Sequence, residues 1–149
     1  MTGRQLLKQS DYQRLAEFRY RLRGFLKFSE HAAAKMGLSP QQHQALLAIK
    51  GTAAGHVTIG ILAERLGIRH NTAVELINRL IANGLVERRQ NPADRREVLV
   101  DLTNRAEKVL AKLSVAHRNE VVKLVPLLRK LLAPFESRRQ ARGRRKRKG

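Results

Sequence analysis

The stretch Gly84–Thr103, GLVERRQNPADRREVLVDLT, decides the fold that the rest of the chain must fit. Two short runs rich in branched residues, Leu85–Gln90 and Val98–Leu102, flank the segment 91–94, whose Asn, Pro and Asp favour turns. The pattern predicts two antiparallel strands joined by a loop. Because a helix-turn-helix pattern precedes it, the hairpin is interpreted as the wing of a winged helix that binds DNA.

The predicted hairpin is rich in arginine. Arg88 and Arg89 lie on its first strand, and Arg95 and Arg96 follow Asp94 in the loop, which places four arginines within nine positions. Guanidinium groups at the tip of a hairpin suit phosphates or a narrow minor groove. The alternative is a solvated turn that contains an ion pair between Asp94 and Arg96.

Upstream of the wing, the spacing of apolar residues predicts two short helices. Thr58 is a helix cap, a first helix runs to Leu66, and Gly67 permits a turn. A second helix is expected after Arg69 and ends near Asn83, with Gly84 as a left-handed stop. Its expected buried side consists of Ala73, Leu76, Ile77 and Leu80.

A short helix, a glycine turn and a second helix with a polar outer face are typical of a helix that lies in the major groove. We expect the groove to be faced or flanked by His70, Asn71, Thr72, Val74, Glu75, Asn78 and Arg79. Arg69, Arg88 and Arg89, with the helix terminus at Thr58, are expected mainly at phosphates. Glu75 either accepts a hydrogen bond from cytosine N4 or pairs with Arg79 within the helix.

The segments LAERLGIRHNTAVELINRLIANGLVERR and DRREVLVDLT together resemble the MarR family of winged-helix transcriptional regulators, over about Ser39–Leu113. The resemblance implies that Asp94 holds Arg96 so that its guanidinium enters the minor groove, and that Arg79 matches an arginine late in the recognition helix. It also implies a dimer, and an effector of the small aromatic or anionic kind that such proteins commonly bind. The residues that carry the resemblance best are Leu62, Ala63, Leu66, Leu80, Gly84, Leu85, Val86, Arg88, Asp94, Arg96, Leu102 and Thr103.

Long amphipathic segments flank the winged unit. A capping box at Ser10–Gln13 and a following apolar series predict one helix over about 11–36, and Ser39 with Pro40 marks the start of the next. Residues 103–135 continue as helix, with a kink or break expected near Val125 because Pro126 lacks an N–H donor. Since the resembled family interlocks its terminal helices across a two-fold axis, we expect a homodimer; the alternative is packing within one chain.

The domain organisation follows. Residues 1–9 are expected to be flexible, 10–136 to form the winged-helix domain with dimerisation helices around a DNA-binding core at about 39–102, and 137–149 to form a disordered basic tail. That tail holds eight of the 31 lysines and arginines. The rest of the chain, with 23 basic and 12 acidic residues, still carries +11 of the total +19, a balance that attracts polyanions.

Several function classes are disfavoured. The chain has no cysteine, hence no disulfide, thiolate zinc site or thiol sensor. Its five histidines lack a zinc-binding spacing, and no phosphate loop, nucleophile elbow or carboxylate pair indicates an enzyme, so no catalytic residue, metal or cofactor is expected. No run of apolar residues is long enough to span a membrane and no signal peptide is evident, so we expect a cytoplasmic protein.

The sequence thus predicts a mainly α-helical winged helix-turn-helix protein with a two-stranded wing and flanking dimerisation helices. Its expected function is that of a homodimeric transcriptional regulator, a repressor, which binds a pseudo-palindromic operator in double-stranded DNA and is released by a small effector. Tyr12, Arg19, Arg23 and His43 are candidates for an effector crevice. The alternatives are a nonspecific architectural DNA- or RNA-binding protein that uses its basic tail, and a ligand-binding or enzymatic helical protein.

Overall fold

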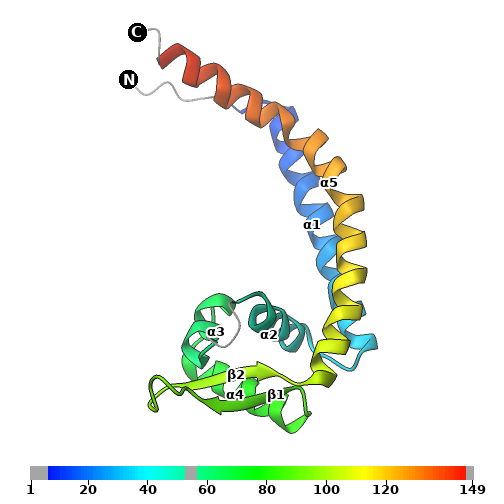
Figure 1. Cartoon of the computed structure of the whole chain (residues 1–149). Helices are drawn as coiled ribbons and strands as arrows, with labels where there is room; N and C mark the ends of the chain where they lie inside the picture. Colours follow the sequence, from blue (N-terminus) through cyan, green and yellow to red (C-terminus); the bar gives the residue numbers. More distant parts are fainter. Residues whose placement is uncertain (1–6, 53–56, 147–149) are drawn as a thin grey trace. The chain divides into compact units, whose positions relative to one another are not determined.

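The computed structural model describes residues 7–52 and 57–146. Within them, long helices and one two-stranded antiparallel sheet form the winged helix-turn-helix that the sequence predicts (Figure 1). The elements are, in chain order, α1 (Gln9–Lys35), α2 (Pro40–Gly51), α3 (Ile59–Leu66), α4 (His70–Ala82), β1 (Val86–Gln90), β2 (Val98–Leu102) and α5 (Asn104–Lys146).

The chain divides into two compact units. One is Ser29–Ala116, which contains α2, α3, α4 and the hairpin, and the other consists of the residues up to Phe28 together with those from His117 onward. The helices α1 and α5 each contribute to both units. We call the first the winged unit and the second the helical unit.

Helix α2 begins as its sequence predicts. The Ser39 hydroxyl accepts a hydrogen bond from the Gln42 backbone N–H at 3.1 Å, and the Ser39 backbone N–H donates to the Gln42 side chain at 3.0 Å. Pro40 occupies the first turn, where a missing N–H costs nothing. This reciprocal capping fixes where α2 starts.

The two helices of the helix-turn-helix are delimited by threonine and glycine. The Thr58 hydroxyl caps α3 by accepting from the Ile61 N–H at 3.1 Å. Gly67 and Gly84, which follow α3 and α4, have φ angles of +63° and +70°. Only glycine adopts this left-handed region without steric cost, so both turns depend on it.

The two predicted strands of the wing pair with each other in antiparallel fashion. Residues of β1 and β2 face one another from Val86 opposite Leu102 to Gln90 opposite Val98. On its other edge, β2 meets the segment before α3: an isolated bridge joins Thr58 to Leu99, and the Val100 N–H donates to the Val57 carbonyl at 2.9 Å. The hairpin is therefore tied to the start of the helix-turn-helix.

The hydrophobic core lies in the winged unit and joins every element of it. It takes the apolar faces of α2, α3 and α4, the inner face of the hairpin and the first turns of α5. Its fully buried side chains include Leu46, Leu62, Ile77, Leu80, Val86 and Val100. The four residues expected on the buried side of α4 are all buried.

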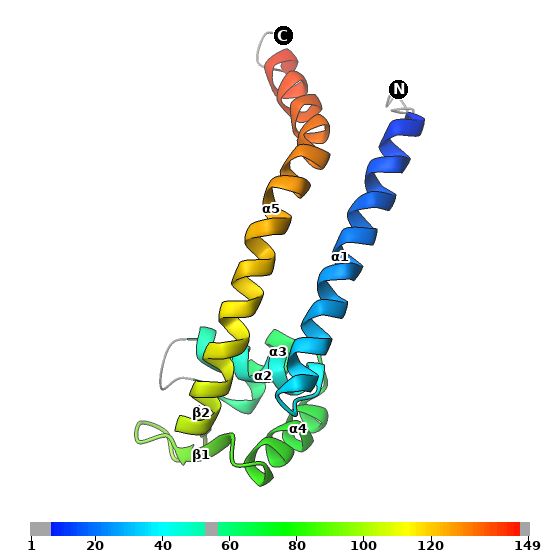
Figure 2. The same cartoon turned by 90° about the vertical axis from the view of Figure 1, so that its right-hand side faces the viewer.

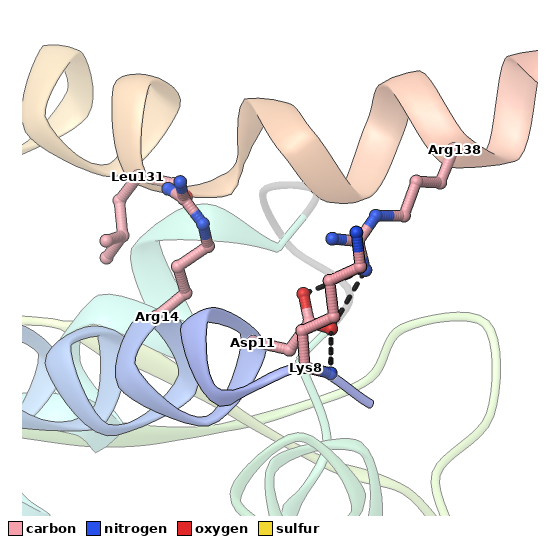
Figure 3. Close-up of polar contacts among 5 residues, drawn as sticks. All are labelled: Lys8, Asp11, Arg14, Leu131 and Arg138. Atoms are coloured by element: carbon pink, nitrogen blue, oxygen red, sulfur yellow. Dashed lines mark hydrogen bonds and ion pairs between the residues drawn. The ribbon is translucent and has the colours of Figure 1, made fainter. Parts of the chain in front are cut away.

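In the helical unit, α1 and α5 run alongside each other in opposite directions (Figure 2). Phe25 and Phe28 of α1 meet His117 of α5 edge to face, with ring centroids 6.0 Å and 5.4 Å apart. Farther along, the Arg14 guanidinium donates to the Leu131 carbonyl at 2.9 Å (Figure 3). Aromatic edges and a charged hydrogen bond thus hold the two helices together.

The start of α1 corrects a prediction. The helix begins at Gln9, so the expected capping box at Ser10–Gln13 lies inside its first turn. Asp11 acts as the cap instead, because its carboxylate accepts from the Lys8 backbone N–H at 2.9 Å. A carboxylate there also interacts favourably with the positive end of the helix dipole.

Of the kink or break expected near Val125, the break does not form. Helix α5 continues through both Pro126 and Pro134. A proline removes one hydrogen bond and distorts the turn before it, but contacts on the same face can carry the helix past that turn. Arg14 supplies one such contact, since the Leu131 carbonyl lies in the turn before Pro134. Figure 1 shows α5 bending along its orange part rather than ending.

The expected disordered tail is also corrected over most of its length. Residues 137–146 continue α5 as helix, while 147–149, and the stretch 1–6 of the expected flexible N-terminus, lie outside the described residues. Composition argued for disorder because the segment has almost no apolar side chain to bury. The ion pair between Arg138 and Asp11, which composition does not reveal, holds this end of α5 on α1 (Figure 3).

Two adjacent leucines of α2 test the assignment of the core. Leu46 is fully buried, whereas Leu47 is 49% exposed. We expect Leu46→Ala to lower the free energy of unfolding by about 2–5 kcal/mol through lost burial and a residual cavity, and Leu47→Ala to change it by less than about 0.5 kcal/mol. Urea denaturation at one fixed chain concentration measures both, and equal losses would contradict the assignment.

Candidate nucleic-acid interface

The candidate interface is built on α4, because burial of one side of this helix determines what its other side presents. Ala73, Leu76, Ile77 and Leu80 point into the core. The opposite side is polar: His70, Asn71, Thr72, Glu75, Asn78 and Arg79 are exposed, and Val74 is half-buried. All seven residues predicted to face or flank a groove therefore lie where solvent or DNA can reach them.

Glu75 belongs to this exposed face. Among the ion pairs of the described residues, none joins Glu75 to Arg79, so the intrahelical alternative is not formed here. Its carboxylate is available to accept a hydrogen bond from an amino group, which on a base edge in the major groove means cytosine N4 or adenine N6.

Two predicted phosphate contacts lie at the starts of α3 and α4. Thr58 caps α3 with its hydroxyl oxygen, which leaves the hydroxyl hydrogen to donate elsewhere. Arg69 occupies the cap position of α4, is exposed and makes no capping bond with its side chain. Helix N-termini carry free backbone N–H groups, so a cation and a hydroxyl at these positions suit an anion.

The first strand of the wing is fastened to α4 by a contact that the sequence reading missed. Arg88 of β1 donates a hydrogen bond from its guanidinium to the side-chain oxygen of Asn78 in α4. The strand register places Arg88 on the same side as the buried Val86, which turns its side chain toward α4. The alternation of side chains along β1 is the signal in the sequence that indicates this contact.

Arg89 lies on the other side of the same strand and has a different partner. Its Nε is 2.7 Å from a carboxylate oxygen of Asp101 on β2. This hydrogen bond and the adjacent negative charge raise the pKa of the Arg89 guanidinium above its ordinary value, so the group stays charged. Both partners are partly exposed, and such pairs contribute little to stability, so the pair orients Arg89 rather than holding the fold together.

The wing tip is ordered by short hydrogen bonds. The Asp94 carboxylate accepts from the Arg96 backbone N–H at 3.0 Å, and the Asp94 carbonyl accepts from the Glu97 N–H at 3.1 Å. Asn91 adds a bond from its amide to the Glu97 carboxylate at 2.9 Å. These hydrogen bonds give the tip a defined turn conformation.

Asp94 therefore orients Arg96 through the backbone. In the described wing, the only ion pair is that of Arg89 with Asp101, so the alternative of an Asp94–Arg96 pair is not formed. Arg95 and Arg96 are exposed at the tip, which extends beyond the neighbouring helices in both views (Figures 1 and 2). Two guanidinium groups at a protruding turn are free to enter a groove.

The residues considered for an effector crevice are not brought together at one described site. His43 is buried within α2 and has an interaction partner of its own, so it does not line an open crevice. Tyr12, Arg19 and Arg23 lie on α1 in the helical unit, where Tyr12 is 55% exposed. Arg23 borders a cavity of that unit, beside Tyr20 and Lys123.

In the part of the chain that the structure describes, nothing indicates a metal site or a helix that spans a membrane. No cluster of three or more histidine, aspartate or glutamate residues there is arranged to hold a metal ion. None of the described helices combines the length and apolar character that crossing a bilayer requires.

Comparison with known proteins agrees with this geometry. Residues 36–97, which contain α2, α3, α4 and most of the wing, match the model of the MarR family. A curated relative from Bacillus subtilis (strain 168), the uncharacterized HTH-type transcriptional regulator YsmB, is 35% identical over 69 residues. That match covers 46% of this chain and spans about half, 47%, of the relative.

Solved structures share the fold over nearly the whole chain. The MarR family regulator AbsC from Streptomyces coelicolor aligns with a TM-score of 0.68 at 18% identity, covering 92% of this chain and 99% of AbsC. The complex of MepR from S. aureus with DNA aligns with a TM-score of 0.67 at 15% identity, covering 92% of this chain and 96% of MepR. The matched proteins are transcriptional regulators rather than enzymes.

The order of the wing tip generates a prediction. Asp94→Ala removes one hydrogen bond, worth about 1 kcal/mol, from the Arg96 amide, so that amide is expected to exchange its hydrogen about fivefold faster in NMR measurements. Asp101→Ala is the control, since it removes a carboxylate from the same hairpin without touching that amide. Equal acceleration in both variants would mean that Asp94 does not order the tip.

Proposed function

We propose that this chain, whose residues 36–97 match the model of the MarR family, is a sequence-specific, DNA-binding transcriptional regulator. The main support for the proposal is that two surfaces suited to binding DNA belong to the same compact unit. The polar face of α4 and the basic hairpin share a core, and Arg88 is bonded to Asn78 across their junction. A helix and a wing held in this way address adjacent grooves of one duplex.

The residues divide into two roles in this proposal. His70, Asn71, Thr72, Val74, Glu75, Asn78 and Arg79 face or flank the major groove, where base edges differ in their donors and acceptors. Arg95 and Arg96 enter the minor groove from the wing tip. Thr58, Arg69, Arg88 and Arg89 contact phosphates and fix the register of the protein on the duplex.

A homodimer is part of the same proposal. In the helical unit, large apolar side chains of α1 and α5 are exposed in the single chain, among them Leu22, Leu26, Val121 and Val122. Exposed apolar residues on two long helices favour a second copy of the chain as the cover. Two-fold symmetry would present two copies of α4 to successive major grooves, hence a pseudo-palindromic operator with half-sites about one helical turn, roughly 10 bp, apart.

We further propose that the protein is a repressor released by a small aromatic or anionic effector. The helical unit contains an open cavity lined by Tyr20, Phe25 and Leu124 together with the cations of Arg23 and Lys123. Aromatic rings and cations at one cavity match the chemistry of such a molecule. Ligands that shift the melting temperature of the protein would identify this effector.

The proposal predicts how one arginine contributes to affinity. Arg96→Ala should weaken binding to the protein's own promoter region by about 1–3 kcal/mol, with much less effect on scrambled DNA of equal length. Fluorescence anisotropy titrations at one salt concentration measure both affinities. Arg118→Ala, which removes the same charge from an exposed position of α5, is the control.

The titrations also separate the proposal from its competitor. Clear preference of the unaltered protein for its promoter supports a sequence-specific regulator. Equal affinity for promoter and scrambled DNA, unchanged by Arg96→Ala, would contradict it and favour a nonspecific architectural protein.

A further inference from the structure

The last turns of α5 are strongly basic and yet ordered. From Ser137 onward the chain has no acidic residue, and the helix continues to Lys146. Over positions 138–146 the helix axis rises by about 12 Å and carries six cations, roughly one per 2 Å. Duplex DNA carries one phosphate per about 1.7 Å of its axis, so the two charge densities are similar.

The basic positions are also arranged along the helix. Five of the six recur at i, i+1, i+4, i+7 and i+8, the spacing at which helical positions share one stripe, and Arg144 lies outside it. The five are Arg138, Arg139, Arg142, Arg145 and Lys146. Apolar residues do not form a matching stripe, since only Ala141 and Gly143 interrupt the polar sequence of this segment. A helix that lies on a membrane needs an apolar face, so this one is unsuited to a lipid surface.

The segment is held at one point. Nη1 of Arg138 donates to Oδ2 of Asp11 at 2.9 Å and lies 2.8 Å from Oδ1 of the same carboxylate, as Figure 3 shows. The Asp11 side chain is completely buried, while that of Arg138 is 37% exposed. The Arg138 guanidinium and the Lys8 N–H hold the pKa of Asp11 below its ordinary value, so the carboxylate stays ionised at neutral pH.

This contact serves two helices at once. Asp11 caps the start of α1 through Lys8 and anchors α5 through Arg138. Arg14, one turn along α1, holds the Leu131 carbonyl on the other side of Pro134. The two contacts lie on either side of that proline and hold α5 to α1 there.

We propose that residues 138–146 form a basic arm, latched to α1 by Asp11, that binds the phosphates of duplex DNA outside the sequence read by α4 and the wing. The proposal rests on the DNA-binding function proposed above and adds a second contact surface to it. Because the backbone of this segment is already helical, binding does not cost the entropy of ordering that backbone. The arm increases affinity and salt dependence but not sequence preference, because phosphate contacts carry no sequence information.

The test compares full-length variants with equal loss of charge. R139Q/R142Q/R145Q/K146Q neutralises four arm positions, spares Arg138 and keeps good helix formers. K112Q/R118Q/R129Q/K130Q neutralises four exposed positions elsewhere on α5. Each variant is titrated with a short duplex limited to the operator, with a longer duplex that adds flanking DNA, and with a single-stranded RNA, over a range of salt concentrations.

On the longer duplex, the slope of log affinity against log salt is expected to fall by about 0.9 for each phosphate contact that the arm variant loses. The preference for promoter over scrambled DNA should remain, and the control variant should keep the slope of the unaltered protein. Equal slopes for the arm variant and the unaltered protein would overturn the proposal. So would an equal fall in both variants, which would report net charge alone, or a loss confined to the RNA.

Asp11→Asn tests the latch separately. The amide loses the charge that holds Arg138, so the backbone amides of residues 139–143 should exchange hydrogen faster while those of the winged unit do not change. If the backbone amides of residues 139–143 exchange hydrogen at an unchanged rate, Asp11 does not hold the arm and this part of the proposal is wrong. If the unaltered protein shows no preference for its promoter, the proposed function is contradicted. If the arm variant nevertheless lowers the slope of log affinity against log salt, the proposal of a DNA-binding arm is still supported.

Discussion

Burial of one side of α4 is the constraint on which the rest of the structure depends. Leu80 and Ile77 are completely buried, and the same core includes side chains from α2, α3, the hairpin and α5. Because the periodicity of a helix is fixed, its four buried positions determine which residues face outward. The polar face that we assign to DNA is thus set by packing, and its orientation is as well defined as the core itself.

The wing inherits its position from the same packing. Val86 and Val100 insert into the core, the Val57–Thr58 segment pairs with β2, and Arg88 is bonded to Asn78. The hairpin is thereby tied on one edge to the start of α3 and on one face to α4. Preorganisation of this kind means that little entropy is lost when both surfaces meet a duplex.

Sequence patterns predicted the winged unit well because its signals are local. Ser39 with Pro40, Thr58, Gly67 and Gly84 mark helix ends through capping and backbone conformation, and the apolar spacing of α4 identified its four buried residues. Two expectations for α5 were wrong, the alternative of a break near Val125 and the disorder of the basic tail, because the contacts that hold this part of the helix come from a distant segment of the chain. Neither Pro126 nor the basic end of the chain reveals that Arg14 and Asp11, more than a hundred positions away, hold α5. The link between Arg88 and Asn78 was missed for a similar reason, since it joins a strand to a helix.

The central claim is that α4 and the wing engage one duplex together, in two copies. A hydroxyl-radical footprint of the purified protein on its own promoter tests this most directly, because the method reports minor-groove exposure base by base. The account predicts two related protected patches with half-site centres about one helical turn, roughly 10 bp, apart, each lost at its outer edge when Arg96 is replaced by Ala. Uniform weak protection along the promoter, unaltered by that replacement, would contradict it.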